Sequence, residues 1–170
     1  MRRLLDGLYD GAAWIAALFM VGTLLSVLAG IIDRYLTLGL RGTDMYAGYC
    51  MAGAGFLALA HTLKRGEHIR VTLILQKLHG QAKHRLEIWS LGAATLLAAL
   101  FAFYSIKLAY QSWVFHDIST GNDATPLWIP QLSMAAGNVI LAIAFVDLLL
   151  ATILGGRTPA VRADEPAHVE

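Results

Sequence analysis

Charged residues are scarce in this sequence. Asp, Glu, Lys and Arg make up only 15% of its 170 residues, whereas hydrophobic residues make up 57%. A soluble domain usually carries about a quarter charged residues, and its core could not hold this much apolar surface. The mean hydropathy of +0.58 therefore favours lipid as the solvent. The net charge of +1 gives no indication of a nucleic-acid partner.

Cysteine and the motifs of catalysis are also nearly absent. Cys50 is the single cysteine, which excludes an internal disulfide and, inside an apolar run, argues against a redox or metal site. No two histidines are expected at matching depth on different spans, as bis-histidine haem ligation requires. No nucleophile motif, phosphate-binding glycine loop or carboxylate pair is present. The sequence predicts a protein that is not an enzyme and has no cofactor or metal.

Four long apolar segments are present, and each approaches or exceeds the roughly 20 residues that a spanning helix needs. Their approximate ranges are 12–32, 45–63, 88–115 and 126–154. In hydrocarbon every backbone N–H and C=O must be satisfied within the segment, so these runs are helices. The sequence thus predicts an all-α membrane protein with four transmembrane helices in one domain, 1–154. Residues 155–170 lack apolar periodicity and are expected to be a disordered cytoplasmic tail.

Lys and Arg are distributed unequally between the two ends of these segments. Ten precede the first segment, separate the second from the third or follow the fourth, and two lie between the first and second. Basic loops stay in the cytoplasm, so both termini are expected there. The ten are Arg2, Arg3, Lys64, Arg65, Arg70, Lys77, Lys83, Arg85, Arg157 and Arg162, and the two are Arg34 and Arg41.

The segment between the second and third spans carries an amphipathic pattern over residues 69–79. Its apolar residues recur at i, i+3, i+4 and i+7, and polar residues occupy much of the remaining surface. This spacing predicts a helix that is too short to span and lies along the cytoplasmic interface; an ordinary charged turn is the alternative. The apolar positions are Val71, Ile74, Leu75 and Leu78.

Two ionisable residues interrupt the spans, and an ionisable residue in a span is a functional candidate by default. Lys107 lies toward the outer end of the third span, where its stem could reach the interface. Asp147 lies about two turns from the inner end of the fourth span, so the two are not expected to pair. Small residues four apart also form stripes, which serve either packing within the chain or docking of another subunit. They are Gly22, Ser26 and Gly30; Ser90, Ala94, Ala98 and Ala102; and Ser133 and Gly137.

Residues 58–71, which read ALAHTLKRGEHIRV, resemble the signature of the DctQ-like small membrane subunit of tripartite ATP-independent periplasmic (TRAP) transporters. Arg34-Tyr35, Asp44 and the Pro126–Gln131 stretch fit the same pattern, and the resemblance extends over about 33–150. Thr72 departs from it, because the family often has an acidic residue after the valine. That departure puts a specific ion pair at this position in doubt.

The resemblance implies a subunit of the bacterial inner membrane that has no transport path of its own. Members of the family associate with a large membrane subunit that moves substrate by an elevator-type motion powered by a sodium gradient. A soluble periplasmic binding protein delivers the substrate, typically an organic acid. The small subunit is expected to act as a scaffold for the large one and to offer part of the outer docking surface.

The residues expected at partner or lipid interfaces fall into two groups. Basic residues of the signature are expected to contact lipid phosphates or the partner's cytoplasmic side, or simply to set the topology. Polar and aromatic residues near the outer end are expected at a partner or lipid interface, and the two outer loops could contact the binding protein weakly. Asp147, outside both groups, is expected to pair with a basic residue or a partner protein. The first group is Lys64, Arg65, His68 and Arg70; the second is Arg34, Tyr35, Asp44 and Trp128.

Two other functions remain open on sequence alone. The chain could be a self-sufficient small ion-coupled transporter acting as a homodimer, with Asp147 as coupling site; Asp147→Asn would then abolish transport and leave assembly intact. It could also be a membrane enzyme or haem-bearing redox subunit, which the placement of the histidines argues against.

Overall fold

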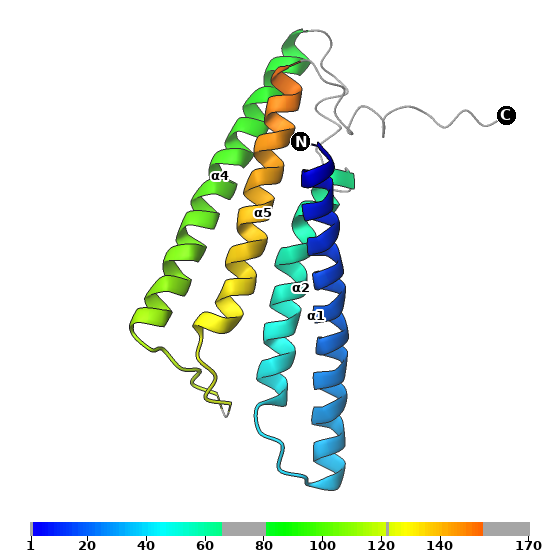
Figure 1. Ribbon diagram of the computed structural model, residues 1–170, viewed down its shortest axis with the longest axis vertical. Helices are drawn as coiled ribbons and strands as arrows, with labels where there is room; N and C mark the ends of the chain where they lie inside the picture. The colour runs from blue at the N-terminus through cyan, green and yellow to red at the C-terminus, as the bar shows by residue number, and fades with distance from the viewer. Residues whose placement is uncertain (1, 66–80, 122, 155–170) are drawn as a thin grey trace, which may run out of the picture.

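The computed structural model describes residues 2–65, 81–121 and 123–154 (Figure 1). Within them the chain forms four α-helices and one isolated β-bridge, between Ile118 and Pro126. The helices are α1 (Arg2–Leu36), α2 (Thr43–Arg65), α4 (Gln81–Val114) and α5 (Trp128–Ile153). The expected amphipathic helix at 69–79 and the expected tail at 155–170 lie outside the described residues.

Three of these helices are long and apolar enough to cross a membrane. The ranges that meet this condition are Leu5–Leu36, His84–Val114 and Trp128–Ile153. The all-helical membrane class is therefore confirmed, whereas the prediction of four spans is not. Helix α2 has 23 residues and would be about 34 Å long, but its polar first turn and its glycines leave it less apolar than the other three.

The four helices lie in a row and do not form a closed bundle. Helix α1 packs along α2, α2 along α5, and α5 along α4, whereas α1 barely meets α5. Figure 1 shows the same order, α4, α5, α2 and α1, across the molecule. In a row, each helix is covered by few neighbouring helices, so large apolar side chains stay exposed on both α1 and α4.

Small residues bring α1 close to α2. A Cβ atom added at Gly22 would lie 3.1 Å from the Sγ atom of Cys50, and one added at Gly30 would lie 3.0 Å from the Oγ1 atom of Thr43. Nearer the termini, the buried Ala16 packs in the same cluster as Leu57. The stripe on α1 therefore serves packing within this chain.

The tightest helix contact joins α2 and α5. A Cβ atom at Gly137 would lie 2.6 Å from the backbone carbon and oxygen of Phe56, a distance that real Cβ atoms essentially never show. One turn away, a Cβ atom at Gly53 would lie 3.1 Å from the Oγ atom of Ser133. Gly137 is thus required by a close approach of the two backbones.

The seam between α4 and α5 is built from small buried side chains with near-heptad spacing on α4. Asn138 of α5, which has no exposed surface, donates a hydrogen bond from Nδ2 to the Oγ atom of Ser105 at 2.7 Å. Ser105 in turn donates to the carbonyl oxygen of Phe101 at 2.7 Å. The buried positions of α4 are Leu91, Ala98, Ala102, Ser105, Ala109 and Ser112.

Candidate functional site

Two loops, residues 37–42 and residues 115–121 with 123–127, meet at one end of the row. We call this end the loop end and include in it the flanking helix residues 33–36, 43–46 and 128. Gly42 has φ +83, in the left-handed region that favours glycine. A Cβ atom there would lie 2.5 Å from the Cβ atom of Asp123. The turn between α1 and α2 is therefore in direct contact with the long loop between α4 and α5.

The long loop is fixed by its own backbone and by two tyrosines of α2. Ser119 N–H donates to the carbonyl of Thr125 at 2.8 Å beside the single β-bridge. The Tyr49 hydroxyl donates to the Oδ2 atom of Asp123 at 3.1 Å, and the Thr125 hydroxyl donates to the Tyr46 hydroxyl at 3.3 Å. These contacts hold the loop against the first two turns of α2.

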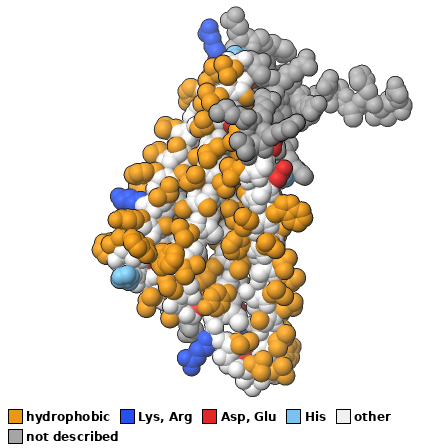
Figure 2. Space-filling model, viewed as in Figure 1, with side chains coloured by type: hydrophobic (Ala, Val, Ile, Leu, Met, Phe, Trp, Pro, Cys, Tyr) orange, Lys and Arg blue, Asp and Glu red, His pale blue; other side chains and the backbone are white. Residues whose placement is uncertain are grey.

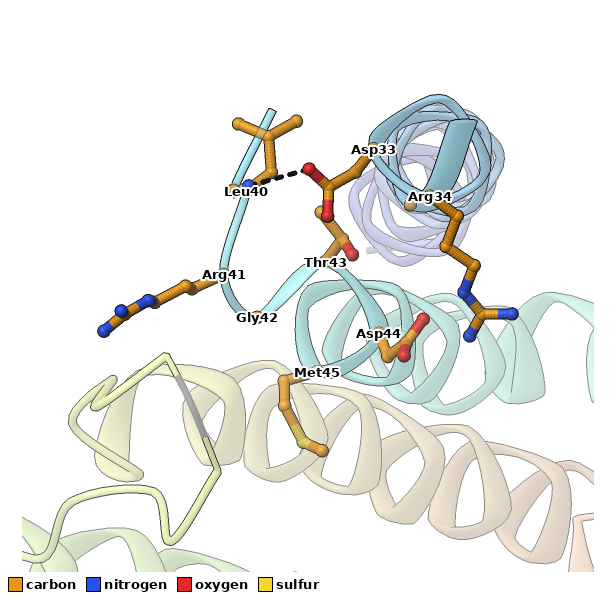
Figure 3. A pocket seen from close by; sticks show the side chains of 10 residues that line it. Asp33, Arg34, Leu40, Arg41, Gly42, Thr43, Asp44 and Met45 are labelled. Carbon is orange, nitrogen blue, oxygen red and sulfur yellow. Dashed lines mark hydrogen bonds between the residues drawn. The ribbon is translucent and has the colours of Figure 1, made fainter. Parts of the chain in front are cut away.

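A shallow cleft of about 340 Å³ opens beside the α1–α2 turn (Figure 3). Asp33 closes the turn by accepting the backbone N–H of Leu40 at 2.9 Å. In Figure 3 the side chains of Arg34 and Asp44 extend on the same side of the turn, and Arg41 extends away from them. Arg34 and Asp44 are both exposed, and no ion pair joins them in the described part of the chain. The cleft thus presents exposed charges of both signs.

The Asp123 carboxyl is the loop-end group whose pKa shifts. Partial desolvation raises the pKa, but hydrogen bonds with the Thr125 and Ser119 side chains, its own backbone and the Tyr49 hydroxyl outweigh this, and the net pKa lies below the usual range. A depressed pKa means that the carboxylate contributes stability above the unfolded value of about 3.9. That contribution is lost as pH falls through the lower, folded value.

We expect Asp123→Asn to lower the thermal unfolding temperature in detergent at pH 7, because the hydrogen bonds then end on a neutral amide. The difference from the unchanged chain should shrink below about pH 4, as Asp123 itself is protonated. Intrinsic tryptophan fluorescence during heating, repeated from pH 3 to pH 7, measures both effects. Asp117→Asn, in the same loop and exposed, is the control. A difference that does not change with pH contradicts the prediction.

A second polar group occupies the opposite, terminal end of the row. The Nδ1 atom of His61 on α2 lies 3.4 Å from the Oδ1 atom of Asp10 on α1. Tyr9, only 3% exposed, packs in a cluster with Ala60 and Ala144. The group therefore joins α1, α2 and α5 at this end.

The structure places the predicted interface residues at both ends of the row. Arg34 and Asp44 line the cleft, Tyr35 is 85% exposed at the end of α1, and Trp128 opens α5. Asp147 is exposed near the other end of α5, far along that helix from Trp128. Lys64 and Arg65 are the last two residues of α2, and His68 and Arg70 lie outside the described residues. The expected roles of all nine residues stay predictions.

Three polar contacts were missed by reasoning from sequence. Tyr49 and Asp123 are 74 positions apart, and no local pattern links them. Ser105 and Asn138 could have been suspected, because Ser105 and Ser112 on one helix, and Gln131 and Asn138 on the other, are each seven residues apart. Polar residues with this spacing in apolar helices predict facing positions. No comparable spacing in the sequence links His61 with Asp10.

Among the described residues, no three His, Cys, Asp or Glu side chains gather where they could hold a metal ion. The described residues form an all-helical membrane protein whose loop end is polar and held in place by hydrogen bonds. Comparison with known families refines this class. The model of the DctQ component of tripartite ATP-independent periplasmic transporters matches residues 23–155, more than three quarters of the chain. A comparison with curated proteins gives no match.

The chain therefore belongs to the DctQ family and is a small membrane component of a TRAP transporter. The resemblance seen in the sequence is confirmed. The family consists of transporter components and is generally non-enzymatic.

Proposed function

We propose that this chain is the non-catalytic small permease subunit that scaffolds the large, elevator-type membrane subunit of a TRAP transporter. The complex takes up an organic acid, driven by a sodium gradient, after a periplasmic binding protein delivers it. Membership of the DctQ family is the observation that carries this proposal. The large subunit and the binding protein are its partners, together with membrane phospholipids.

The helix row supports a scaffolding role. Apart from Leu91, the buried positions of α4 are filled by alanine and serine side chains, and Gly137 of α5 lies directly against the backbone of α2. Close contacts of this kind favour a rigid frame. An elevator needs a static frame against which its mobile domain moves, and a flat row of helices extends such a frame more than a compact bundle does.

We also propose that α2 is a fourth span and that both termini are cytoplasmic, in the bacterial inner membrane. Helix α2 lies between α1 and α5 and packs on both, so it shares their environment, and its length of about 34 Å suits a hydrocarbon layer of about 30 Å. In the sequence, ten basic residues precede the first predicted span, separate the second from the third or follow the fourth, and two lie between the first and second. This distribution supports the orientation. The loop end then faces the periplasm.

The loop end is a suitable surface for a transient encounter with the binding protein. Its charges of both signs are exposed, and its loops are fixed to α2. A small, polar, pre-ordered surface fits a weak and reversible contact. Arg34, Tyr35 and Asp44 are the residues that we assign to it. We assign Lys64, Arg65, His68 and Arg70 to lipid phosphates or the partner's cytoplasmic side.

The alternative of a self-sufficient homodimeric transporter gains no support. Asp147 is exposed near the terminal end of α5 and not enclosed at its middle. A coupling carboxylate usually sits among other polar groups near the bilayer midplane.

Reconstitution tests the proposal. Proteoliposomes that contain only this chain should show no sodium-dependent uptake of organic acids. Vesicles that also contain the large subunit of the same transporter should take up the acid when the loaded binding protein and a sodium gradient are added. The large subunit should also copurify with this chain in mild detergent. Robust uptake by the chain alone, or no copurification, would refute the scaffold role.

A further inference from the structure

Lys107 occupies an unusual position on α4. Its side chain is exposed, and within the part of the chain that the structure describes it has no ion pair. At 100° per residue, Lys107 points away from the buried seam positions Ala98, Ser105 and Ala109. Among the described helices, α5 packs along α4, and α2 meets it through the rings of Phe56 and Phe101, whose centroids are 6.1 Å apart. Phe101 lies six residues before Lys107, about 120° around the helix, so neither contact covers the Lys107 face. Figure 2 shows that hydrophobic side chains cover most of the surface over α4 and that basic side chains are few there.

The surface around Lys107 is aromatic. Phe103 (61% exposed), Tyr104 (60%) and Tyr110 (61%) lie one turn away on the same side of the helix. The rings of Phe103 and Tyr104 pack edge to face with centroids 5.6 Å apart. We call Phe103, Tyr104, Lys107 and Tyr110 the α4 aromatic face. Aromatic side chains are enriched at the centre of protein interfaces, whereas lysine is depleted there, so a lysine among them requires a partner of opposite charge.

The exposed surface of α1 has a different composition. Trp14 (75% exposed) lies toward the terminal end, but from Ile15 to Ile32 the large exposed side chains are aliphatic or methionine, with Leu18 69% and Leu25 60% exposed. No charged side chain lies between Asp10 and Asp33. Uniform aliphatic surface is what lipid tails cover. The two outer edges of the row therefore differ in chemistry, and only α4 carries a cation within its apolar stretch.

We propose that the α4 aromatic face is where the large membrane subunit docks, with a carboxylate of one of its spanning helices paired to Lys107. This inference rests on the proposed function and adds the contact face. An ammonium in hydrocarbon requires an opposite charge or a route to water. A partner carboxylate at the same depth meets this need and also covers the aromatic side chains.

A lipid phosphate at the loop-end surface fits less well. Lys107 lies seven residues before the last residue of α4, about 10 Å along the axis. The Cα–Cβ bond of a helical residue tilts toward the helix N-terminus, which for α4 is the terminal end. The lysine stem therefore starts away from the nearer membrane surface, toward the middle of the bilayer.

The first test uses charge variants of this chain, co-expressed with the large subunit of the same transporter and purified in mild detergent. K107E should reduce the amount of retained large subunit about tenfold, since it places like charges together, and K107R should retain it. Arg85→Glu reverses an exposed charge on the same helix outside the aromatic face and should have no effect. Equal retention by K107E and K107R would overturn the proposal.

The second test locates the contact without relying on the charge. In a Cys50→Ser background, Tyr104→Cys and, as the matched control, Leu25→Cys are labelled with a thiol-linked photocrosslinker. Tyr104→Cys should give a covalent adduct with the large subunit at least tenfold more abundant than Leu25→Cys. Adducts with lipid alone at Tyr104→Cys, or a stronger protein adduct at Leu25→Cys, would overturn the proposed face. If the unchanged chain retains no large subunit, the proposed function itself fails.

Discussion

Gly137→Ala is expected to lower the thermal unfolding temperature of the purified chain, and Gly137→Val is expected to lower it further. The added Cβ atom would lie 2.6 Å from the backbone carbon and oxygen of Phe56, and backbone atoms cannot rotate away. The two helices must therefore separate or tilt. Overpacking of this kind costs about 1–3 kcal/mol, which corresponds to a shift of roughly 2–12 °C for a chain of this size.

The matched control for Gly137 is Gly55→Ala on α2. A Cβ atom at Gly55 meets nothing within 4 Å, so the substitution only exchanges glycine for a better helix former and should leave the unfolding temperature unchanged or raise it. Unfolding is followed by intrinsic tryptophan fluorescence in one detergent. If Gly137→Ala behaves like Gly55→Ala, the close approach of α2 and α5 is wrong.

Much of the fold followed from local features of the sequence. The helix α1 contains the predicted span 12–32 and extends beyond it at both ends, because an apolar run sets the minimum length of a helix and not its ends. The helix α5 begins at Trp128 and not at Pro126, since Pro126 pairs with Ile118 in the β-bridge and Leu127 donates its N–H to the carbonyl of Asp117.

The arrangement of the helices could not be predicted from those features. Small-residue stripes indicate that helices approach closely but not which partners they meet. The stripe with Gly22 on α1 packs on α2, and so do Ser133 and Gly137 of α5. Only Ser90 among the stripe residues of α4 is exposed. The structure thus favours packing within the chain over subunit docking for these stripes.

The contacts at the loop end were equally hard to predict from the sequence. Arg34 and Asp44 could be placed near one another, because both flank the short turn between the first two helices. The contact of Gly42 with Asp123 could not, since it joins residues about 80 positions apart through the packing of all the intervening helices. The long loop is therefore predictable as a loop, but its fixed position on α2 is not.

Asn138→Asp is expected to destabilise the chain strongly, and Asn138→Leu much less. Asn138 has no exposed surface, and its amide donates to Ser105 while its Oδ1 atom accepts no hydrogen bond among the described residues. A carboxylate at this position places a charge between helices α4 and α5. Insertion of Asp at the centre of a spanning helix costs about 2.5–3.5 kcal/mol, which corresponds to a fall of roughly 10 °C in the unfolding temperature.

Asn138→Leu removes both the hydrogen bond and the unsatisfied oxygen. Interhelical hydrogen bonds in membranes contribute about 0.6 kcal/mol on average, and deleting a buried acceptor without a partner offsets part of that loss. Its unfolding temperature should therefore stay within about 3 °C of the unchanged chain. Ser105→Ala is the matched control on α4, because it leaves the Asn138 amide without its acceptor. Its unfolding temperature should lie between those of Asn138→Asp and Asn138→Leu.

An Asn138→Asp variant as stable as Asn138→Leu at pH 7 would show that water reaches this seam. Helix α4, which packs mainly on α5, would then be less firmly held than a scaffold requires.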